Sequence, residues 1–130
     1  MSDHVVDTHA LYWYLIDAPQ LGRAARTIMD DAMNGQGLLI VPSIVLAELY
    51  YLNVKLNAPL NIADEFQWMV STGRFAFVDF QAADVLQFDA LAAIPEMHDR
   101  IVAGVAVSRN LPPLTRDATI VNSGLVQTIW

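Results

Sequence analysis

The sequence predicts an α/β fold with a central, mostly parallel sheet, and three observations support this. Short strand-like runs alternate with helical stretches along the chain. Residues 38–42, "LLIVP", form an uninterrupted apolar run of the kind found in strands buried on both faces of a parallel sheet. Hydrophobic residues make up 55% of a chain of 130 residues, which is ample material for one core. We therefore expect a single domain over residues 1–130, with helices on both faces of the sheet.

The first half of the chain predicts two strands and four helices. In order, these are a strand ending at Val6, a helix that stops at Pro19, a helix over 20–33, the strand 38–42, a helix over 43–56 and a helix over 62–71. The helix over 20–33 has apolar residues at helical spacing, and Asn34-Gly35 supplies the left-handed conformation that often ends a helix. Asp7 or Thr8 is placed to cap the first helix.

The second half continues the alternation. In order, it predicts a strand over 74–80, a helix over 82–93, a loop over "IPEMHD", a helix opened by Asp99 and ended by Asn110, a short strand and loop at "LTRD", and a strand over 126–130. The double proline at 112–113 leads into "LTRD" because proline favours extended chain on either side of itself.

Composition excludes several classes of protein. The absence of cysteine excludes disulfides and thiolate metal sites. No apolar run approaches the ~20 residues of a membrane span, and the N-terminus lacks a signal-peptide pattern, so we expect a cytoplasmic protein. The net charge of -7 opposes nonspecific attraction to nucleic acid, although a local basic patch or bound cations can reverse this in one region.

Four carboxylates fall at or near the strand-to-helix side of the expected sheet. Asp7 directly follows the first strand, and Glu48 lies in the first turns of the helix after residues 38–42. Asp99 starts a helix, and Asp117 follows the last short strand. Ligands of parallel α/β sheets bind beyond the carboxyl ends of the strands. Half-buried carboxylates that meet there repel one another, and Mg²⁺ or Mn²⁺ relieves that repulsion and supplies activated water.

Each acid also has a purely structural interpretation. An aspartate before a helix is most often a cap, which alone explains Asp7 and Asp99. Asp117 fits a turn residue and Glu48 a solvated helix face. The matching position of all four in alternating elements favours the functional interpretation.

The ordered motifs of the sequence resemble segments of a known family. "VVDTHALYWYL", "SIVLAELYYL", "HDRIVAGVAV" and "LPPLTRD" are similar to segments of PIN domains, most closely the VapC-type ribonuclease toxins of bacterial toxin–antitoxin pairs. The resemblance extends through "GLVQTIW" and implies a three-layer α/β/α fold. It also implies a metal-dependent endoribonuclease that hydrolyses RNA phosphodiester bonds with Mg²⁺, or Mn²⁺, as cofactor. The partners it implies are a VapB-like antitoxin and, with the apolar surplus, a second copy in a homodimer.

The resemblance also assigns roles to residues. Asp7, Glu48, Asp99 and Asp117 become metal ligands and catalytic residues. Thr115 is counted with the catalytic residues, because it matches a hydroxyl position that holds a metal-bound water. Thr8 is assigned to substrate binding, where it either holds such a water as well or only caps a helix.

Some side chains near the acids keep two interpretations. Arg100 and Arg116 are the best candidates for phosphate contact, with a solvated charge or a salt bridge as the alternative. His98 fits a general base or metal ligand, but more simply a loop histidine, and His9 is expected to pack or cap. The aromatic run at residues 12–14 suggests base stacking. At helical spacing, the core or a dimer contact is the favoured interpretation.

Two further functions compete with the nuclease. In the first, Asp7 is the nucleophile of a phosphoryl transfer, but "DTHAL" lacks a second aspartate two residues on. We also expect no lysine near the site, because Lys55 is the only one in the chain. In the second, a degenerate PIN domain binds RNA or a partner without cleaving, and the presence of all four acids argues against it.

Overall fold

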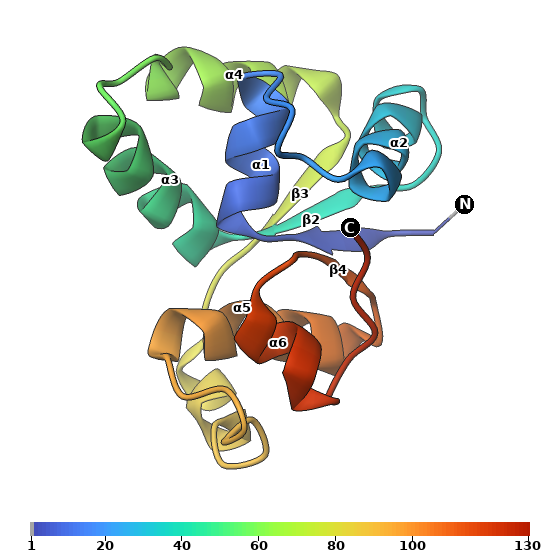
Figure 1. Ribbon diagram of the computed structural model, residues 1–130, viewed down its shortest axis with the longest axis vertical. Coiled ribbons are helices and arrows are strands. Elements are labelled where there is room, and N and C mark those ends of the chain that lie inside the picture. Colours follow the sequence, from blue (N-terminus) through green and yellow to red (C-terminus); the bar gives the residue numbers. More distant parts are fainter. Residues whose placement is uncertain (1) are drawn as a thin grey trace.

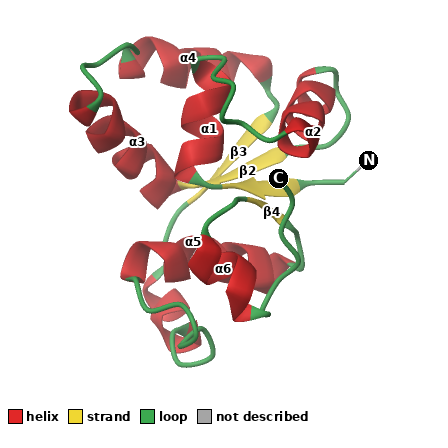
Figure 2. Cartoon of the chain, in the orientation of Figure 1, coloured by secondary structure: helices red, strands yellow, loops and turns green. Residues whose placement is uncertain are grey.

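The computed structural model describes residues 2–130 and contains one four-stranded sheet. The strands are β1 (His4–Val6), β2 (Leu39–Pro42), β3 (Phe75–Val78) and β4 (Pro113–Leu114). Their spatial order is β3-β2-β1-β4, and every pairing is parallel. The parallel sheet expected from the sequence is therefore confirmed, and Figure 2 shows it at the centre of the molecule.

Helices cover both faces of this sheet. They are α1 (Thr8–Leu15), α2 (Arg23–Met33), α3 (Ser43–Lys55), α4 (Ile62–Thr72), the 3₁₀ helix η1 (Ala82–Gln87), α5 (Met97–Arg109) and α6 (Ala118–Ser123). In Figure 1, α1 to α4 lie above the sheet, and α5 and α6 lie below it. The chain steps outward from β1 to β3 and then returns past β1 to β4. Right-handed crossovers in opposite directions place their helices on opposite faces, which produces the three-layer α/β/α arrangement.

The order of the strands fixes where a ligand can bind. The chain runs from β1 outward through β2 to β3 and then crosses back to β4 on the other side of β1, so the direction of the connections reverses between β1 and β4, and the crevice opens beyond the carboxyl ends of these two strands. Val6 pairs with Leu114, and the amide of Asp7 donates to the Leu114 carbonyl. The residues that follow β1 and β4 therefore lie side by side at the carboxyl end of the sheet.

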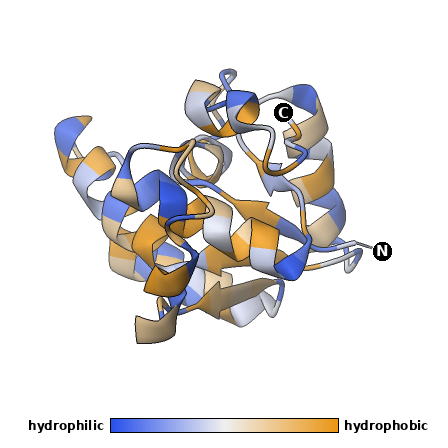
Figure 3. Cartoon of the chain, turned by 90° about the horizontal axis from the view of Figure 1, so that it is seen from below, coloured by the Kyte–Doolittle hydropathy of each residue, from blue (hydrophilic) through white to orange (hydrophobic). Residues whose placement is uncertain are grey.

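The core lies between the sheet and its helices. Every residue of β1 and β2 is buried, as the apolar run at 38–42 predicts. Leu11 of α1, Met29 of α2 and Leu49 of α3 are fully buried against the strands. Each such side chain contributes about 1.5–3 kcal/mol by leaving water. Figure 3 shows the hydrophobic strands at the centre, with hydrophilic residues interspersed on the surrounding helices.

The helix expected over 82–93 is wrong in type and length. Only the 3₁₀ helix η1 forms, and tight turns continue to Ile94, with amides bonded three residues back, from Leu91 to Phe88 and from Ile94 to Leu91. Residues three apart share a face at this tighter winding, so Leu91 and Ile94 are buried together. Gly104 of α5 permits the close approach, because a Cβ there would lie 3.3 Å from the Leu91 side chain.

Three other boundaries differ from expectation. α5 begins at Met97 within the expected loop, with Glu96 as its cap, so Asp99 lies in the first turn instead of opening the helix. The strand expected over 126–130 is reduced to a single bridge between Ile129 and Leu114. The helix α6, which the sequence did not suggest, begins immediately after Asp117. Across the described residues, every helix is too short or too polar to cross a membrane.

Candidate functional site

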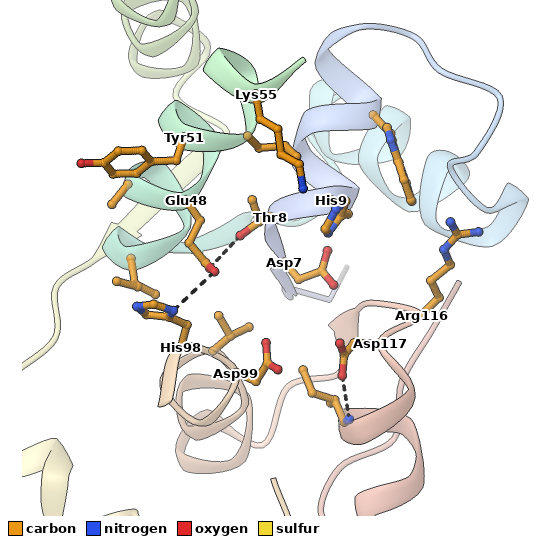
Figure 4. A pocket seen from close by; sticks show the side chains of 16 residues that line it. Asp7, Thr8, His9, Glu48, Tyr51, Lys55, His98, Asp99, Arg116 and Asp117 are labelled. Atoms are coloured by element: carbon orange, nitrogen blue, oxygen red, sulfur yellow. Dashed lines mark hydrogen bonds and ion pairs between the residues drawn. The ribbon is translucent and has the colours of Figure 1, made fainter. Parts of the chain in front are cut away.

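A cavity of about 740 Å³ opens at the carboxyl end of the sheet. The four carboxylates singled out in the sequence all line it, and they come from four different elements of the chain: Asp7, Glu48, Asp99 and Asp117. Figure 4 shows them arranged around one central space. The convergence expected from the strand-end rule is thus present in the fold, while the chemical role of each acid stays a prediction.

Asp7 occupies the most constrained position. It follows β1 directly, and its carboxylate caps α1 by accepting a hydrogen bond of 2.8 Å from the Ala10 amide. Burial raises the pKa of this carboxyl group, and the charge of Asp117 adds to the rise. Hydrogen bonds from the Thr115 hydroxyl and the Ala10 amide act in the opposite direction without cancelling it. Asp7 is therefore both a helix cap and a cavity residue.

The loop between β4 and α6 brings Thr115 and Asp117 to the same place. Thr115 is 1% exposed, and its hydroxyl accepts a hydrogen bond of 3.0 Å from the Asp117 amide. Asp117 caps α6 by accepting hydrogen bonds from the amides of Thr119 and Ile120. The sequence-based alternative of a turn residue is thus partly correct, since Asp117 also faces the cavity.

Glu48 projects from the second turn of α3 and pairs with two neighbours. The hydroxyl of Thr8 donates to its Oε1 at 2.9 Å, and Nδ1 of His98 lies 3.9 Å from its Oε2. The same His98 nitrogen is 2.9 Å from Oε1 of Glu96, a fifth acid that sequence reasoning did not single out. Thr8 therefore does not cap α1, because Asp7 does so, and it anchors Glu48 instead.

Asp99 experiences the mutual repulsion of the acids most directly. Burial, followed by the charges of Asp117, Glu96, Glu48 and Asp7, raises the pKa of its carboxyl group to about 6. The Glu96 carboxylate also accepts a hydrogen bond of 2.8 Å from the Asp99 amide. A rise with four carboxylates among its causes is the electrostatic signature of convergence.

The donor chemistry of this cavity fits a hard divalent cation. Its acids supply the carboxylate oxygens that Mg²⁺ and Mn²⁺ prefer, and a cation would reverse the electrostatic penalty at Asp99. Within residues 2–130, however, no three acidic or histidine side chains are positioned closely enough to hold an ion as they are oriented. In this arrangement one or two carboxylates would hold the metal and water would complete its coordination, as is common for Mg²⁺, unless further side chains rotate toward it.

Lys55 is a residue that sequence reasoning misplaced. It lines the same cavity, and Figure 4 shows its side chain reaching from the end of α3 toward the acids. The expectation that no lysine lies near the site is wrong. The 3.6-residue period of the helix held the signal, because Glu48, Leu52 and Lys55 at positions i, i+4 and i+7 share one face. This correction removes one of the two arguments against phosphoryl transfer and leaves the missing second aspartate.

The two arginines behave differently. Arg116 lines the cavity, and its guanidinium carbon lies 4.5 Å from the centroid of the Trp13 ring. Arg100 does not line it, because its Nε donates to the carbonyl of Ile94 beside η1. The structure thus does not support Arg100 as a phosphate contact. Trp13, expected in the core or at a dimer contact, also lines the cavity, whereas Tyr12 is buried.

The comparison with protein families decides what kind of domain carries this site. The PIN domain profile matches residues 4–122. The chain belongs to the PIN domain family. The match includes every carboxylate discussed above and confirms the resemblance drawn from the ordered motifs.

Solved structures agree on the fold of this PIN domain, and 21 of their chains match it. One is in the crystal structure of VapBC2 from Rickettsia felis bound to a DNA fragment from their promoter. The TM-score is 0.69 at 16% sequence identity, and the alignment covers 99% of this chain and 98% of that chain. At this identity the likeness concerns the fold alone. No curated protein matches the sequence.

Proposed function

We propose that this PIN domain is a metal-dependent endoribonuclease, the toxin of a VapC-type toxin–antitoxin pair. The observation that carries the proposal is the placement of four carboxylates, from four elements, around one cavity at the switch point of a parallel sheet. Membership of the PIN family and the raised pKa of Asp99 support it.

The residues take the following roles in this proposal. Asp7, Glu48, Asp99 and Asp117 hold Mg²⁺ or Mn²⁺, which when bound supplies an activated water and steadies charge on the phosphate. Thr8 fixes the rotamer of Glu48 through its hydrogen bond. Thr115 acts in the same way on the other side, because its buried hydroxyl touches both Asp7 and the Asp117 amide.

Two cations at the edge of the cavity orient the RNA backbone. Lys55 lies at the end of α3 and Arg116 lies in the loop before α6, so they line the cavity from different sides. Within residues 2–130, no carboxylate lies within ion-pair distance of either side chain. Both charges therefore remain available to phosphate in a protein whose net charge is -7.

The partners we propose are a VapB-like antitoxin and a second copy of the chain. The structural neighbour is a VapBC complex, which supports the antitoxin. Exposed apolar side chains on α3 and α4 support burial against another protein, among them Tyr51 (71% exposed), Val54 (56%) and Val70 (55%). Light scattering of the free chain is expected to give a dimer, and a strictly monomeric protein at high concentration would exclude the second copy.

The nuclease is tested by incubating labelled RNA with the protein in Mg²⁺, in Mn²⁺ and in EDTA. We expect endonucleolytic products in either metal and none in EDTA. Cleavage that persists in EDTA would refute metal dependence. Transfer of phosphate to the protein would favour the aspartyl-phosphate reaction instead.

A second candidate function is a degenerate PIN domain that binds RNA without cutting it. The observation that favours it is that, within residues 2–130, no three acidic or histidine side chains lie close enough together to share one ion. RNA that binds saturably and stays intact in both metals would establish this function and exclude the nuclease.

A further inference from the structure

A cluster of aromatic rings and one guanidinium adjoins the acidic cavity. The ring of His9 lies 5.1 Å from that of Trp13, and the ring of Trp13 lies 5.8 Å, edge-on, from that of Trp130. The guanidinium carbon of Arg116 is 4.5 Å from the Trp13 centroid and 5.6 Å from the Trp130 centroid. We refer to these four side chains as the aromatic platform.

The fold holds the platform in place from three directions. His9 and Trp13 lie four residues apart and therefore share one face of α1. Trp130 is fixed because Ile129 exchanges backbone hydrogen bonds with Pro113 and Thr115. Gly22 admits it, since a Cβ at that position would collide with the backbone and ring of Trp130. Trp130 is thus held in a defined position by its neighbours, and it lies outside the residues matched by the family profile.

The guanidinium of Arg116 lies against aromatic rings and not against a carboxylate. Its side chain is exposed, and in the described residues no carboxylate pairs with it, although Asp117 is its neighbour in sequence. Two indole rings within 6 Å are the partners of a cation–π arrangement. Such an arrangement orients a guanidinium plane while leaving its other surface open to a ligand.

The position of the platform indicates what it binds. The cavity that contains Asp7 and Asp117 is also lined by three members of the platform: His9, Trp13 and Arg116. The platform is therefore adjacent to the acids. We propose that the aromatic platform stacks a nucleobase of the RNA strand whose backbone crosses the acids, an inference that rests on the proposed ribonuclease function.

Charge explains why stacking is needed here. The net charge of -7 and the converging carboxylates oppose binding through phosphates alone. Stacking of a base on an aromatic ring or a guanidinium plane is not opposed by that charge, and it tolerates any base because each has a π face. The platform therefore favours single-stranded or looped RNA, in which bases are free to leave their own stack.

The test uses tryptophan fluorescence in EDTA and again in Ca²⁺, so that it does not depend on cleavage. The Trp68→Phe variant is the reference, because Trp68 lies on α4 outside the cavity and its removal leaves Trp13 and Trp130 as the reporters. It is titrated with a single-stranded RNA of about six nucleotides and with an abasic sugar-phosphate oligomer of equal length. We expect saturable quenching by the RNA, and binding of the abasic oligomer that is weaker by on the order of tenfold.

Substitutions at Arg116 and Trp13 separate stacking from charge. Arg116→Lys keeps the charge but loses the planar guanidinium, so we expect it to bind the RNA on the order of tenfold more weakly and the abasic oligomer unchanged. Trp13→Leu should likewise weaken binding of the RNA and leave binding of the abasic oligomer unchanged. Trp13→Phe, which keeps an aromatic ring, should recover part of the RNA affinity. Arg109→Lys, on a helix end outside the cavity, is the matched control and should change neither ligand.

The inference is overturned if the Trp68→Phe reference binds both oligomers equally or neither. It is also overturned if Arg116→Lys retains full RNA affinity, or if an antitoxin-derived peptide but no RNA quenches the tryptophans. These outcomes are independent of catalysis. Failure of the proposed function would instead appear as intact RNA in Mg²⁺, whatever the fluorescence shows.

Discussion

The first turn of α5 and the loop between β4 and α6 carry the same pair of residue types with opposite results. Each places an arginine next to a cavity carboxylate, as Asp99-Arg100 and as Arg116-Asp117. In the helix, successive side chains point about 100° apart, so Arg100 turns away to the Ile94 carbonyl while Asp99 faces the cavity. In the loop, the chain leaves a strand and caps a helix, and both residues reach the cavity. Adjacency in sequence therefore predicts a shared site only when the local backbone is known.

The largest expected effect concerns the two acids, which should behave alike. Asp99→Asn and Asp117→Asn each keep the shape of the side chain and remove a charge that we propose binds the metal. We expect each to lower the cleavage rate by more than the roughly 10–100-fold that loss of an outer-shell partner causes. Asp89→Asn, at an exposed turn outside the cavity, is the matched control. A variant of either acid that cuts at the control rate would remove that residue from the site.

The arginines should behave differently from each other. Binding of single-stranded RNA weakens with salt, and removal of one phosphate contact reduces the slope of log K against log[salt] by about 0.7. We expect this reduction for Arg116→Ala and Lys55→Ala and no change for Arg100→Ala. Arg100→Ala should instead lower the free energy of unfolding by about 1 kcal/mol, because the Ile94 carbonyl loses its donor. An unchanged slope in Arg116→Ala would refute the proposal that Arg116, unlike Arg100, contacts phosphate.

The positions that can be predicted from the sequence are those at which one local rule determines one residue. Asp7 and Asp117 come directly after strands, and parallel strands bring their carboxyl ends to a common edge, so both positions were predictable. The apolar run at 38–42 fixed β2 within one residue. The alternation of strands and helices was sufficient to predict the three layers, because right-handed crossover connections determine which face of the sheet each helix covers.

The parts that were missed depend on packing between distant segments. Lys55 enters the cavity only because α3 packs beside α1, and Trp130 reaches Trp13 only because Gly22 admits it. The turns after η1 form because Leu91 is buried against α5 at Gly104, which overrides the helical pattern of 82–93. Such contacts have no signature in a window of neighbouring residues.

A smaller effect is expected for Asp7, which is both a cap and a cavity acid. Asn caps a helix as well as Asp does, so Asp7→Asn removes charge and keeps the cap. We expect the metal-free variant to gain about 1 kcal/mol of stability, because burial and Asp117 both raise the pKa of Asp7. Mg²⁺ should then raise the melting temperature of wild type more than that of the variant. Equal responses of the two proteins to Mg²⁺ would mean that Asp7 is only a cap.

The smallest effect distinguishes Asp99 by its pH dependence. Its pKa in the folded protein is about 6, above the ordinary 3.8, so in metal-free protein the folded state binds more protons than the unfolded state between these values. Stability from this group is therefore fully present below pH 3.8 and is lost as the pH rises through 6. Because Asp99 is partly solvated, we expect wild type to gain only about 1 kcal/mol relative to Asp99→Asn when the pH falls from 7.5 to 5.

Burial lowers the pKa of His4, which costs stability as the pH falls below 6.5, but it does so in both proteins and cancels in the difference. Urea denaturation of both proteins in EDTA across this range measures that difference, and Asp89→Asn should follow wild type. A difference that stays constant with pH would show that Asp99 titrates as an ordinary surface acid, and the acids would then not converge as their shared cavity indicates.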